Sequence, residues 1–395
     1  MYGGKTVGVV VPAYNEAALV GGVIDTMPAF VDRVYVVDDA STDDTWAEIT
    51  RHAGAANDRR VPETTLADGG EARFVVPIRH EANRGPGGAR KTGYARAFAD
   101  GLEVVATMDA DGQMDPAYLG RIVGPVIAGR ASYAKGTRLR NRESWREMPP
   151  FRLFGNLLLT FLTKVASGYW EMTDPQNGYT AISREALAEI GIETLYDDYG
   201  YLNDVLTSLN VRSKRIADVP HPARYGTEHS GIRYATFIPS LSGVLLRNFG
   251  RRLQKRYLLL DFHPLAFLYG LSLVGFLLST LSAAGAIRTR LTARLTGRDR
   301  SGSTSRSARR PSVIRGLAAL HAALFAVITL VLAIAFDARA NEGLVVRADD
   351  APTGDGVSTS DTPTDGLPAD GAFGEEATRG EIDANPTDGE EGSNP

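Results

Sequence analysis

The stretch Val104-Val105-Ala106-Thr107-Met108-Asp109-Ala110-Asp111-Gly112-Gln113 is the most informative part of the sequence. An apolar run that stops at two carboxylates predicts a buried strand, residues 104–108, that delivers acids to the edge of a sheet. Alternate residues of an extended segment point the same way, so Asp109 and Asp111 can face one object together. Two close carboxylates repel each other unless a cation lies between them, and a hard divalent ion that also holds phosphate oxygens would suit. Alone, however, Asp-x-Asp also occurs in plain loops and helix caps.

The sequence before this stretch alternates short apolar runs with helical spacing. The predicted strands are residues 6–11, 33–37, 72–77 and 104–108, and the predicted helices are residues 17–30, 45–53 and 89–100. Residues 54–71 are polar and predict an excursion between a helix and the next strand. Alternation of strands and helices predicts a parallel α/β sheet, whose ligands bind at the carboxyl ends of the strands.

The composition divides the chain into a basic body and an acidic tail. The net charge is −4 and there are no cysteines, which excludes disulfides, zinc–thiolate sites and thiol catalysis. Residues 341–395 hold 14 acids and two arginines, about −12, so residues 1–340 carry about +8. A basic body suits a protein on an anionic membrane surface. The first apolar run is too short for a signal peptide. We also expect no nucleic-acid partner.

The second half of the chain has the pattern of a membrane protein. Residues 151–166 and 234–256 are amphipathic, and each is either core helix or a membrane-surface helix. Residues 265–287 and 316–336 are uncharged and long enough to cross a bilayer, so we predict two transmembrane helices. The segment between them, residues 288–315, is predicted to be irregular, and residues 341–395 to be disordered.

The charges around these helices conflict. A two-helix hairpin puts residues 288–315 on the side opposite the body, yet this segment holds nine arginines, which the positive-inside rule would keep in the cytoplasm. The basic stretch of residues 247–256 argues for a cytoplasmic body. We therefore predict a multi-pass membrane protein with a cytoplasmic body and leave the linker unresolved.

Polar residues also follow the first two predicted strands. After the first comes Pro12-Ala13-Tyr14-Asn15-Glu16, which is either a strand-to-helix turn with Asn15 as cap or the floor of a pocket. In a pocket, Tyr14 can stack on a planar base while Glu16 fixes the edge of that base.

After the second strand come Asp38 and Asp39, and acids at this place often hold a ribose or a base edge. One acid can instead cap the next helix. We expect Asp39 to face the ligand, and either Asp38 or Asp43 to have a structural role.

A glycine-rich turn, residues 83–91, precedes a predicted helix. Its backbone amides could cradle a phosphate at the start of the helix. It lacks the lysine and hydroxyl placement of a Walker loop and the spacing of a dinucleotide fingerprint, so a close-packed turn is the alternative.

Together these motifs resemble family-2 glycosyltransferases, and more narrowly the dolichyl-phosphate or polyprenyl-phosphate mannosyl- and glucosyltransferase branch. The resemblance covers residues 5–255 and extends to Lys135-Gly136-Thr137-Arg138, to the acceptor-side motif of residues 174–179 and to the basic loop of residues 224–230. It implies a GT-A fold, which is an α/β mixed sheet flanked by helices.

The resemblance also implies roles for individual residues. Pro12, Tyr14, Glu16, Asp38 and Asp39 would bind the nucleoside, together with the segment around Ala110. Asp109, Asp111 and Gln113 would hold Mg²⁺ or Mn²⁺ against the pyrophosphate. Arg138 would contact phosphate, with Arg152 and Arg224 as further candidates, while His229 stands where the family commonly has Lys or Arg. The catalytic set would be Asp111, Arg138 and Asp174, with Asp174 either a base or a helix cap.

The expected reaction moves a hexose from a UDP- or GDP-sugar to polyprenyl or dolichyl phosphate, with inversion, at a membrane. The alternative is extension of a lipid-linked oligosaccharide or a glycolipid at a hydroxyl, which would need a true base. A catalytically silent scaffold is a third interpretation, against which the intact acidic set argues. The chain lacks the Gln-x-x-Arg-Trp motif of processive synthases, which argues for one transfer per acceptor; homo-oligomerisation is left open.

The sequence thus divides into four predicted parts. These are a catalytic domain (1–232), a membrane-interface segment (233–263), the two transmembrane helices with their linker (264–340) and the acidic tail (341–395).

Overall fold

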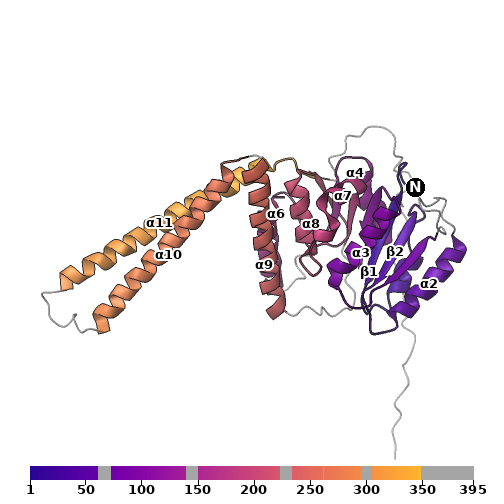
Figure 1. Cartoon of the computed structure of the whole chain (residues 1–395), viewed down its shortest axis with the longest axis horizontal. Helices are drawn as coiled ribbons and strands as arrows, with labels where there is room; N and C mark the ends of the chain where they lie inside the picture. Colours follow the sequence, from indigo (N-terminus) through magenta and orange to yellow (C-terminus); the bar gives the residue numbers. More distant parts are fainter. Residues whose placement is uncertain (61–72, 139–149, 223–233, 261, 296–304, 348–395) are drawn as a thin grey trace, which may run out of the picture. The chain divides into compact units, whose positions relative to one another are not determined.

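The computed structural model describes residues 1–60, 73–138, 150–222, 234–260, 262–295 and 305–347 (Figure 1). The strands are β1 (Val7–Ala13), β2 (Arg33–Asp38), β3 (Val75–Arg79), β4 (Val104–Thr107), β5 (Tyr133–Thr137), β6 (Thr180–Ser183), β7 (Ile216–Pro220) and β8 (Val345–Arg347). The helices are α1 (Val20–Asp25), α2 (Thr45–Arg59), α3 (Gly85–Ala99), α4 (Leu119–Ile127), α6 (Pro150–Ser167), α7 (Arg184–Ile190), α8 (Tyr201–Val211), α9 (Tyr234–Arg252), α10 (Leu265–Leu295) and α11 (Ser305–Ala340). Short helical turns are η1 (Pro116–Tyr118), η2 (Ile192–Thr194) and the π-helical η3 (Leu253–Leu260).

The strands form one mixed sheet in the order β3-β2-β1-β4-β6-β5-β7-β8. β1 pairs in parallel with β2 and β4, while β6 runs antiparallel to both β4 and β5. β4 and β5 therefore point the same way, and their carboxyl ends lie at the same edge of the sheet as those of β1 and β2. The four predicted strands and the mixed sheet flanked by helices are confirmed.

Two apolar cores form because the side chains of each strand alternate between the faces of the sheet. On β1, Val9 and Val11 belong to the core beneath α1, α2 and α4. Val10 belongs to the other core, beneath α3, α7 and α8. Helices thus cover both faces of the sheet, which leaves the strand ends as the open edge for polar residues.

The three helices predicted for residues 17–30, 45–53 and 89–100 all have different bounds in the structure. The helix predicted for residues 17–30 is shorter, Val20–Asp25, and Pro28 disfavours a helical conformation at Met27 beyond its end. The helix predicted for residues 89–100 begins earlier, at Gly85. The predicted helix of residues 45–53 extends to Arg59.

Both amphipathic stretches are helical and lie together. α6 and α9 contact each other, and both contact α8. Other apolar side chains of these helices are exposed, among them Leu158 and Phe161 of α6 at 46 % and 47 %, and Leu246 of α9 at 72 %. Each helix therefore combines a packed face with an outward apolar face.

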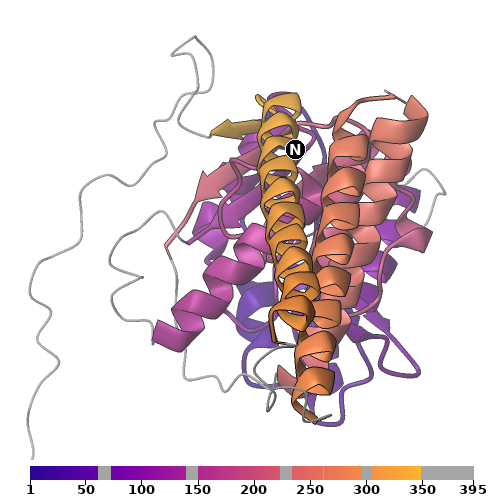
Figure 2. The same ribbon diagram turned by 90° about the vertical axis from the view of Figure 1, so that its left-hand side faces the viewer.

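α10 and α11 form the predicted hairpin, and Figures 1 and 2 show them running alongside each other. By length and composition they contain two candidate membrane spans, Leu265–Thr292 and Val313–Ala340. Ser272 Oγ donates a 2.9 Å hydrogen bond to the Ala326 carbonyl across the pair. The prediction of an irregular segment at residues 288–315 is wrong for its described ends, because α10 continues to Leu295 and α11 begins at Ser305.

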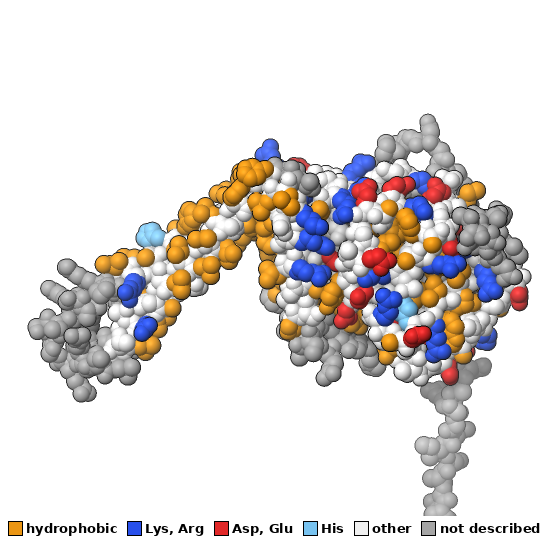
Figure 3. Space-filling view, in the orientation of Figure 1, with side chains coloured by type: hydrophobic (Ala, Val, Ile, Leu, Met, Phe, Trp, Pro, Cys, Tyr) orange, Lys and Arg blue, Asp and Glu red, His pale blue; other side chains and the backbone are white. Residues whose placement is uncertain are grey.

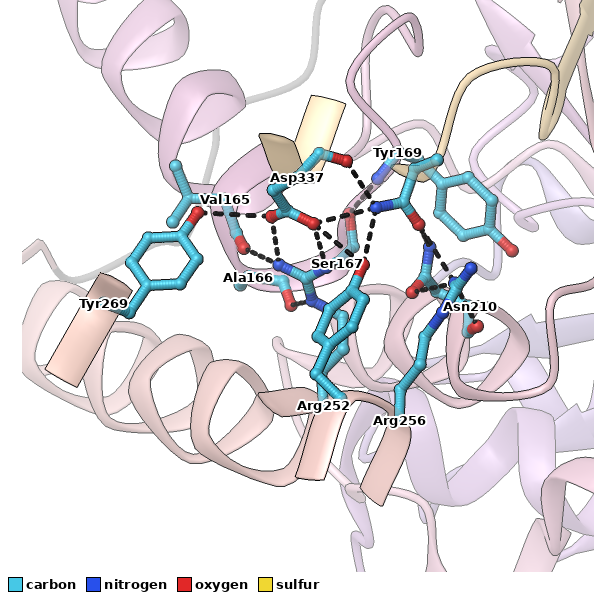
Figure 4. Close-up of polar contacts among 11 residues, drawn as sticks. Val165, Ala166, Ser167, Tyr169, Asn210, Arg252, Arg256, Tyr269 and Asp337 are labelled. Atoms are coloured by element: carbon cyan, nitrogen blue, oxygen red, sulfur yellow. Dashed lines mark hydrogen bonds and ion pairs between the residues drawn. The ribbon is translucent and has the colours of Figure 1, made fainter. Parts of the chain in front are cut away.

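A buried polar network ties the hairpin to the sheet domain (Figure 4). Arg252 at the end of α9 and Asp337 near the end of α11 are both fully buried and form a bidentate ion pair, Nη1–Oδ1 2.8 Å and Nη2–Oδ2 2.7 Å. Tyr257, Tyr269 and Asn341 also donate to the Asp337 carboxylate.

The same network changes the interpretation of the basic stretch. Arg252 donates to the carbonyls of Val165 and Ala166 in α6, and Arg256 donates to the carbonyl of Asn210 in α8. Both arginines are buried, Arg256 at 7 % exposure. They bind the protein itself, so they do not count toward a charged surface that orients the body.

The chain returns from the hairpin to the sheet. β8 pairs in parallel with β7, with Ile216 opposite Val345, and Figure 2 shows β8 as a yellow arrow beside the end of α11. The prediction that disorder begins at residue 341 is therefore wrong for residues 345–347. Residues 348–395 lie outside the described part of the chain.

Candidate active site

The candidate site residues converge on the edge where β1, β2, β4 and β5 end. Tyr14 follows β1, Asp39 follows β2, Asp109 follows β4 and Arg138 follows β5. Residues 174–179 reach the same edge because they enter the antiparallel strand β6. The sheet direction alone thus brings together motifs that are more than 100 residues apart.

The loops after β1 and β2 are bonded to each other. Asn15 accepts from the Thr42 backbone at 2.9 Å, and its own N–H donates to Ser41 Oγ at 2.9 Å. The N–H of Glu16 donates to Thr45 Oγ1 at 2.7 Å. These bonds fix the turn and leave the Tyr14 side chain 47 % exposed, beside the half-buried Pro12. An exposed aromatic ring on a rigid turn is suited to stack on a planar group.

Asp38, the last residue of β2, and Asp43 both form hydrogen bonds within the protein, although only Asp38 is buried. Asp38 is fully buried and accepts from the Ser41 N–H at 3.1 Å, and Arg79 Nε lies 3.1 Å from its other oxygen. Asp43 accepts from the Thr45 N–H at 3.0 Å at the start of α2. Both contacts hold local structure.

Asp39 is 3 % exposed, and one of its oxygens is held by His80. His80 Nδ1 lies 2.6 Å from Asp39 Oδ1, which also accepts from the Arg84 N–H at 2.9 Å. Sequence reasoning missed His80, although it directly follows β3 and so obeys the same strand-end rule. The ligand role of Asp39 stays a prediction.

The Asp109-Ala110-Asp111 segment has the predicted alternation. Ala110 is buried at 1 % exposure, while the Asp109 side chain is 29 % exposed and Asp111 is half-buried. The cation beside Asp109 is the guanidinium of Arg90 on α3, which contacts Oδ1. Arg90 was not singled out from the sequence. Because it forms this ion pair, the acidic pair is partly neutralised by the protein itself.

Gly178 packs directly on Asp109. A Cβ atom on Gly178 would lie 2.8 Å from Asp109 Oδ2 and 3.2 Å from Arg90 Nη2. The acceptor-side motif and the acidic motif are therefore in contact, and a side chain at position 178 would displace the Asp109 carboxylate.

The donor set suits a hard divalent cation. Asp111 accepts from the Gln113 N–H at 2.9 Å, so the residues that would hold an ion lie on one tight loop after β4. Carboxylate and amide oxygens are ligands that Mg²⁺ and Mn²⁺ accept. Within the described ranges no three His, Cys, Asp or Glu side chains are grouped for metal binding, so an ion here would also need oxygens from a ligand.

The glycine-rich turn is close-packed, which is the second of the two sequence interpretations. Gly85 has φ 79°, and the Gly88 N–H donates to the Asp197 carbonyl at 2.8 Å. A Cβ on Gly87 would lie 2.4 Å from the Tyr196 carbonyl oxygen. The start of α3 therefore packs against residues 196–198, and the Gly88 amide is already used by the protein.

Arg138 and Asp174 form a two-point ion pair. Arg138 Nε lies 2.8 Å from Asp174 Oδ2, and Nη2 lies 3.2 Å from Oδ1. Burial alone raises the pKa of Asp174, but hydrogen bonds and the charge of Arg138 outweigh it and hold the pKa at about 2. A carboxylate with this pKa is a weak base. The helix-cap alternative is wrong, because residues 175–179 lead into strand β6.

A histidine stands behind this pair. Asn177 Nδ2 lies 3.3 Å from Asp174 Oδ2 and 2.8 Å from His221 Nε2. His221 donates from Nδ1 to the Pro222 carbonyl at 2.9 Å, which leaves Nε2 to accept. Burial lowers the pKa of His221, and the nearby Arg138 acts in the same direction. Sequence reasoning missed His221, which follows β7 at the same edge.

The structure does not describe the side chains of three residues predicted to contact phosphate. Arg224 and His229 fall in residues 223–233, outside the described ranges, and the side chain of Arg152 is likewise outside them. Their roles stay predictions.

The chain belongs to glycosyl transferase family 2, which it matches over residues 8–191. It is 30 % identical over 230 residues to the UDP-N-acetylglucosamine–dolichyl-phosphate N-acetylglucosaminyltransferase of Methanococcus voltae, covering 58 % of this chain and 89 % of that protein. It is 32 % identical over 209 residues to the polyprenol monophosphomannose synthase of Mycolicibacterium smegmatis, covering 49 % and 67 %. The chain is thus a glycosyltransferase of the GT-A fold whose relatives belong to the polyprenyl-phosphate branch.

Among solved structures, the chain resembles glucosyl-3-phosphoglycerate synthase from Mycobacterium tuberculosis in complex with Mn²⁺, UDP and glucosyl-3-phosphoglycerate. The match has 22 % identity and a TM-score of 0.46, covering 62 % of this chain and 81 % of that one.

Proposed function

We propose that this glycosyltransferase moves a hexose from a UDP- or GDP-sugar to polyprenyl or dolichyl phosphate at the cytoplasmic face of a membrane. The proposal depends on two features that occur in one protein. The first is the site at the carboxyl ends of the strands, called the strand-end site below, which contains Asp109, Asp111 and Arg138. The second is the apolar two-helix hairpin, which the Arg252–Asp337 ion pair holds to the sheet domain. The named relatives act on dolichyl phosphate or make a polyprenol phosphate sugar, which supports the same acceptor class.

The donor would lie across the ends of β1, β2 and β4. Tyr14 would stack on the base, and Pro12, Glu16, Asp38 and Asp39 would shape the nucleoside end of the site. Asp109, Asp111 and Gln113 would hold Mg²⁺ or Mn²⁺ at the pyrophosphate. When bound, the ion would offset the negative charge that builds on the departing nucleotide diphosphate.

The acceptor phosphate supplies its own nucleophile. A phosphate oxygen is anionic near neutral pH, so it can attack the anomeric carbon without losing a proton to the enzyme. The new bond joins that carbon to the acceptor oxygen, and the bond to the nucleotide diphosphate breaks with its electron pair. Attack from the opposite face inverts the anomeric centre. Arg138, whose guanidinium is oriented by Asp174, would position a phosphate.

The geometry disfavours the alternative acceptor. A sugar hydroxyl would need a base, and the candidate base was Asp174. Its low pKa and two-point pairing with Arg138 suit an orienting role better than proton abstraction.

The outward apolar faces of α6 and α9 support the membrane setting. Leu158, Phe161 and Leu246 would enter the interface and bring the strand-end site to the depth of a lipid phosphate.

The experiment is a transfer assay with membranes that contain the full chain. Radiolabelled UDP- and GDP-sugars are incubated with polyprenyl phosphate and Mg²⁺, and label is followed into the organic phase. Label that needs the metal and is released by mild acid supports a lipid phosphate sugar. Label in a glycolipid stable to mild acid would overturn the acceptor assignment. A matched Asp111→Asn chain should give no transfer.

A further inference from the structure

A second polar site lies between α10 and α11, at the end of the hairpin remote from Asp337. A hollow of about 590 Å³ is lined there by Leu281, Ser282, Gly285, Arg288, Thr289, Thr292 and Arg315. Its size falls within the range of roughly 300–1,000 Å³ typical of small-molecule sites. None of these residues belongs to the strand-end site.

The hollow presents cationic and hydroxyl donors. Arg315 Nη1 donates to Thr289 Oγ1 at 2.8 Å and lies 3.5 Å from the Gly285 carbonyl, so its guanidinium is held against α10. Gly285 has no side chain, and a Cβ there would meet Arg315 Cδ at 3.7 Å. Arg288 is exposed and forms no ion pair with the described residues.

Few acids are close to these arginines in the sequence. Between residues 265 and 340 the sequence holds only Asp299 and Asp337. Asp337 is bound by Arg252 at the other end of the hairpin, and Asp299 lies outside the described residues. Within residues 265–340, the nine arginines of residues 288–315 are thus accompanied by only two acids in the sequence.

The position of the hollow matches the depth of lipid headgroups. Arg288 lies four residues before the end of the span Leu265–Thr292, and Arg315 lies two residues after the start of Val313–Ala340. The neighbouring apolar side chains point outward, with Leu281 70 % and Leu320 64 % exposed. Figure 3 shows basic side chains near this end of the hairpin among apolar ones. Basic pockets between membrane helices are suited to anionic headgroups.

We propose that this hollow binds the phosphate headgroup of an anionic phospholipid in the leaflet at the far end of the hairpin. Guanidinium groups offer paired N–H donors that match phosphate oxygens, and the hydroxyl of Ser282 adds a neutral donor. The exposed apolar surface below the arginines would contact the acyl chains, which selects a lipid over a free phosphate ion. Anionic headgroups would also balance the arginine-rich linker that the positive-inside rule leaves unexplained.

The test uses the full chain in nanodiscs of phosphatidylcholine with graded amounts of phosphatidylglycerol. Native mass spectrometry counts the phosphatidylglycerol molecules that stay bound after release from the disc. The variant is Arg288→Gln with Arg315→Gln. Its matched control is Arg290→Gln, which is two residues from Arg288 and so about 200° around the helix. Size-exclusion profiles and melting midpoints confirm that each variant is folded.

We expect one tightly held phosphatidylglycerol in the parent and in Arg290→Gln. The double variant should bind it about 30-fold more weakly, since each arginine near an anionic surface contributes on the order of fivefold. Equal retention by the parent and the double variant would overturn the site. An equal loss in Arg290→Gln would show non-specific charge attraction and also overturn it. Displacement of the lipid by millimolar inorganic phosphate would identify a free-anion site and contradict the lipid assignment.

Discussion

Asp337→Asn should destabilise the protein strongly, because it would leave the buried charge of Arg252 without a counter-charge. Both side chains are 0 % exposed, and the carboxylate takes two charge-assisted hydrogen bonds from the guanidinium. An asparagine amide would keep one neutral acceptor oxygen, and the carbonyls of Val165 and Ala166 would remain, but no negative charge would balance Arg252. Removing one partner of a buried ion pair costs about 3–5 kcal/mol. At about 2–4 °C per kcal/mol, the melting midpoint should fall by roughly 6–20 °C.

The assay is thermal unfolding of the full chain in nanodiscs, followed by tryptophan fluorescence. The double variant Arg252→Met with Asp337→Leu should have a melting midpoint closer to that of the parent, because it contains no unpaired buried charge. The control is Arg51→Gln, which breaks an exposed ion pair with Glu48 and should leave the midpoint unchanged.

Two results would refute this reasoning. One is a shift in Asp337→Asn no larger than that in Arg51→Gln. The other is a double variant whose midpoint falls by the sum of the two single changes, since additivity would mean that the two side chains act independently.

Three further predictions concern the strand-end site. The pKa of Asp174 is held at about 2, below its ordinary value of 3.8. The ionised carboxylate therefore stabilises the fold by about 2 kcal/mol, an effect that is complete above pH 4 and is lost as the pH falls towards 2. Asp174→Asn should remove that part of the pH dependence, measured as unfolding midpoints from pH 6 to 2. Gly178→Ala should abolish transfer without unfolding the chain, since the new methyl would displace Asp109, whereas Gly54→Ala, at an open helical position, should keep full activity; equal activity of the two would contradict the packing argument. Tyr14→Ala should raise the KM for the donor about tenfold while Tyr14→Phe stays near the parent value, because stacking needs only the ring, and steady-state kinetics would decide.

The parts of the fold that were predictable depend on local pattern. Strands β1, β2 and β4 are short apolar runs rich in β-branched residues, and polar residues follow within a few positions of each strand end. Once the strands are parallel, their ends must share an edge, so the neighbourhood of Tyr14, Asp39 and Asp109 followed from chain direction alone.

The parts that were missed depend on contacts distant in sequence. Arg90 is an ordinary basic residue of a helix until α3 packs on the sheet and brings it to Asp109. Arg252 looks in the sequence like one of a run of surface cations, and only the return of α11 buries it against Asp337. β8 has three residues at the start of an acidic tail, and it is a strand because the edge of β7 is available to it.

The position of β8 in the sequence has a consequence for the order in which the sheet is completed during synthesis. β8 is encoded after α11, so the eighth position of the sheet stays empty until both hairpin helices have been synthesised. During that interval β7 lacks the partner that β8 provides, and an unpaired strand edge is a template for the wrong partner. A chain truncated after Ala340 would keep this edge open permanently. The last strand of the sheet can therefore pair with β7 only after both helices of the hairpin have been synthesised.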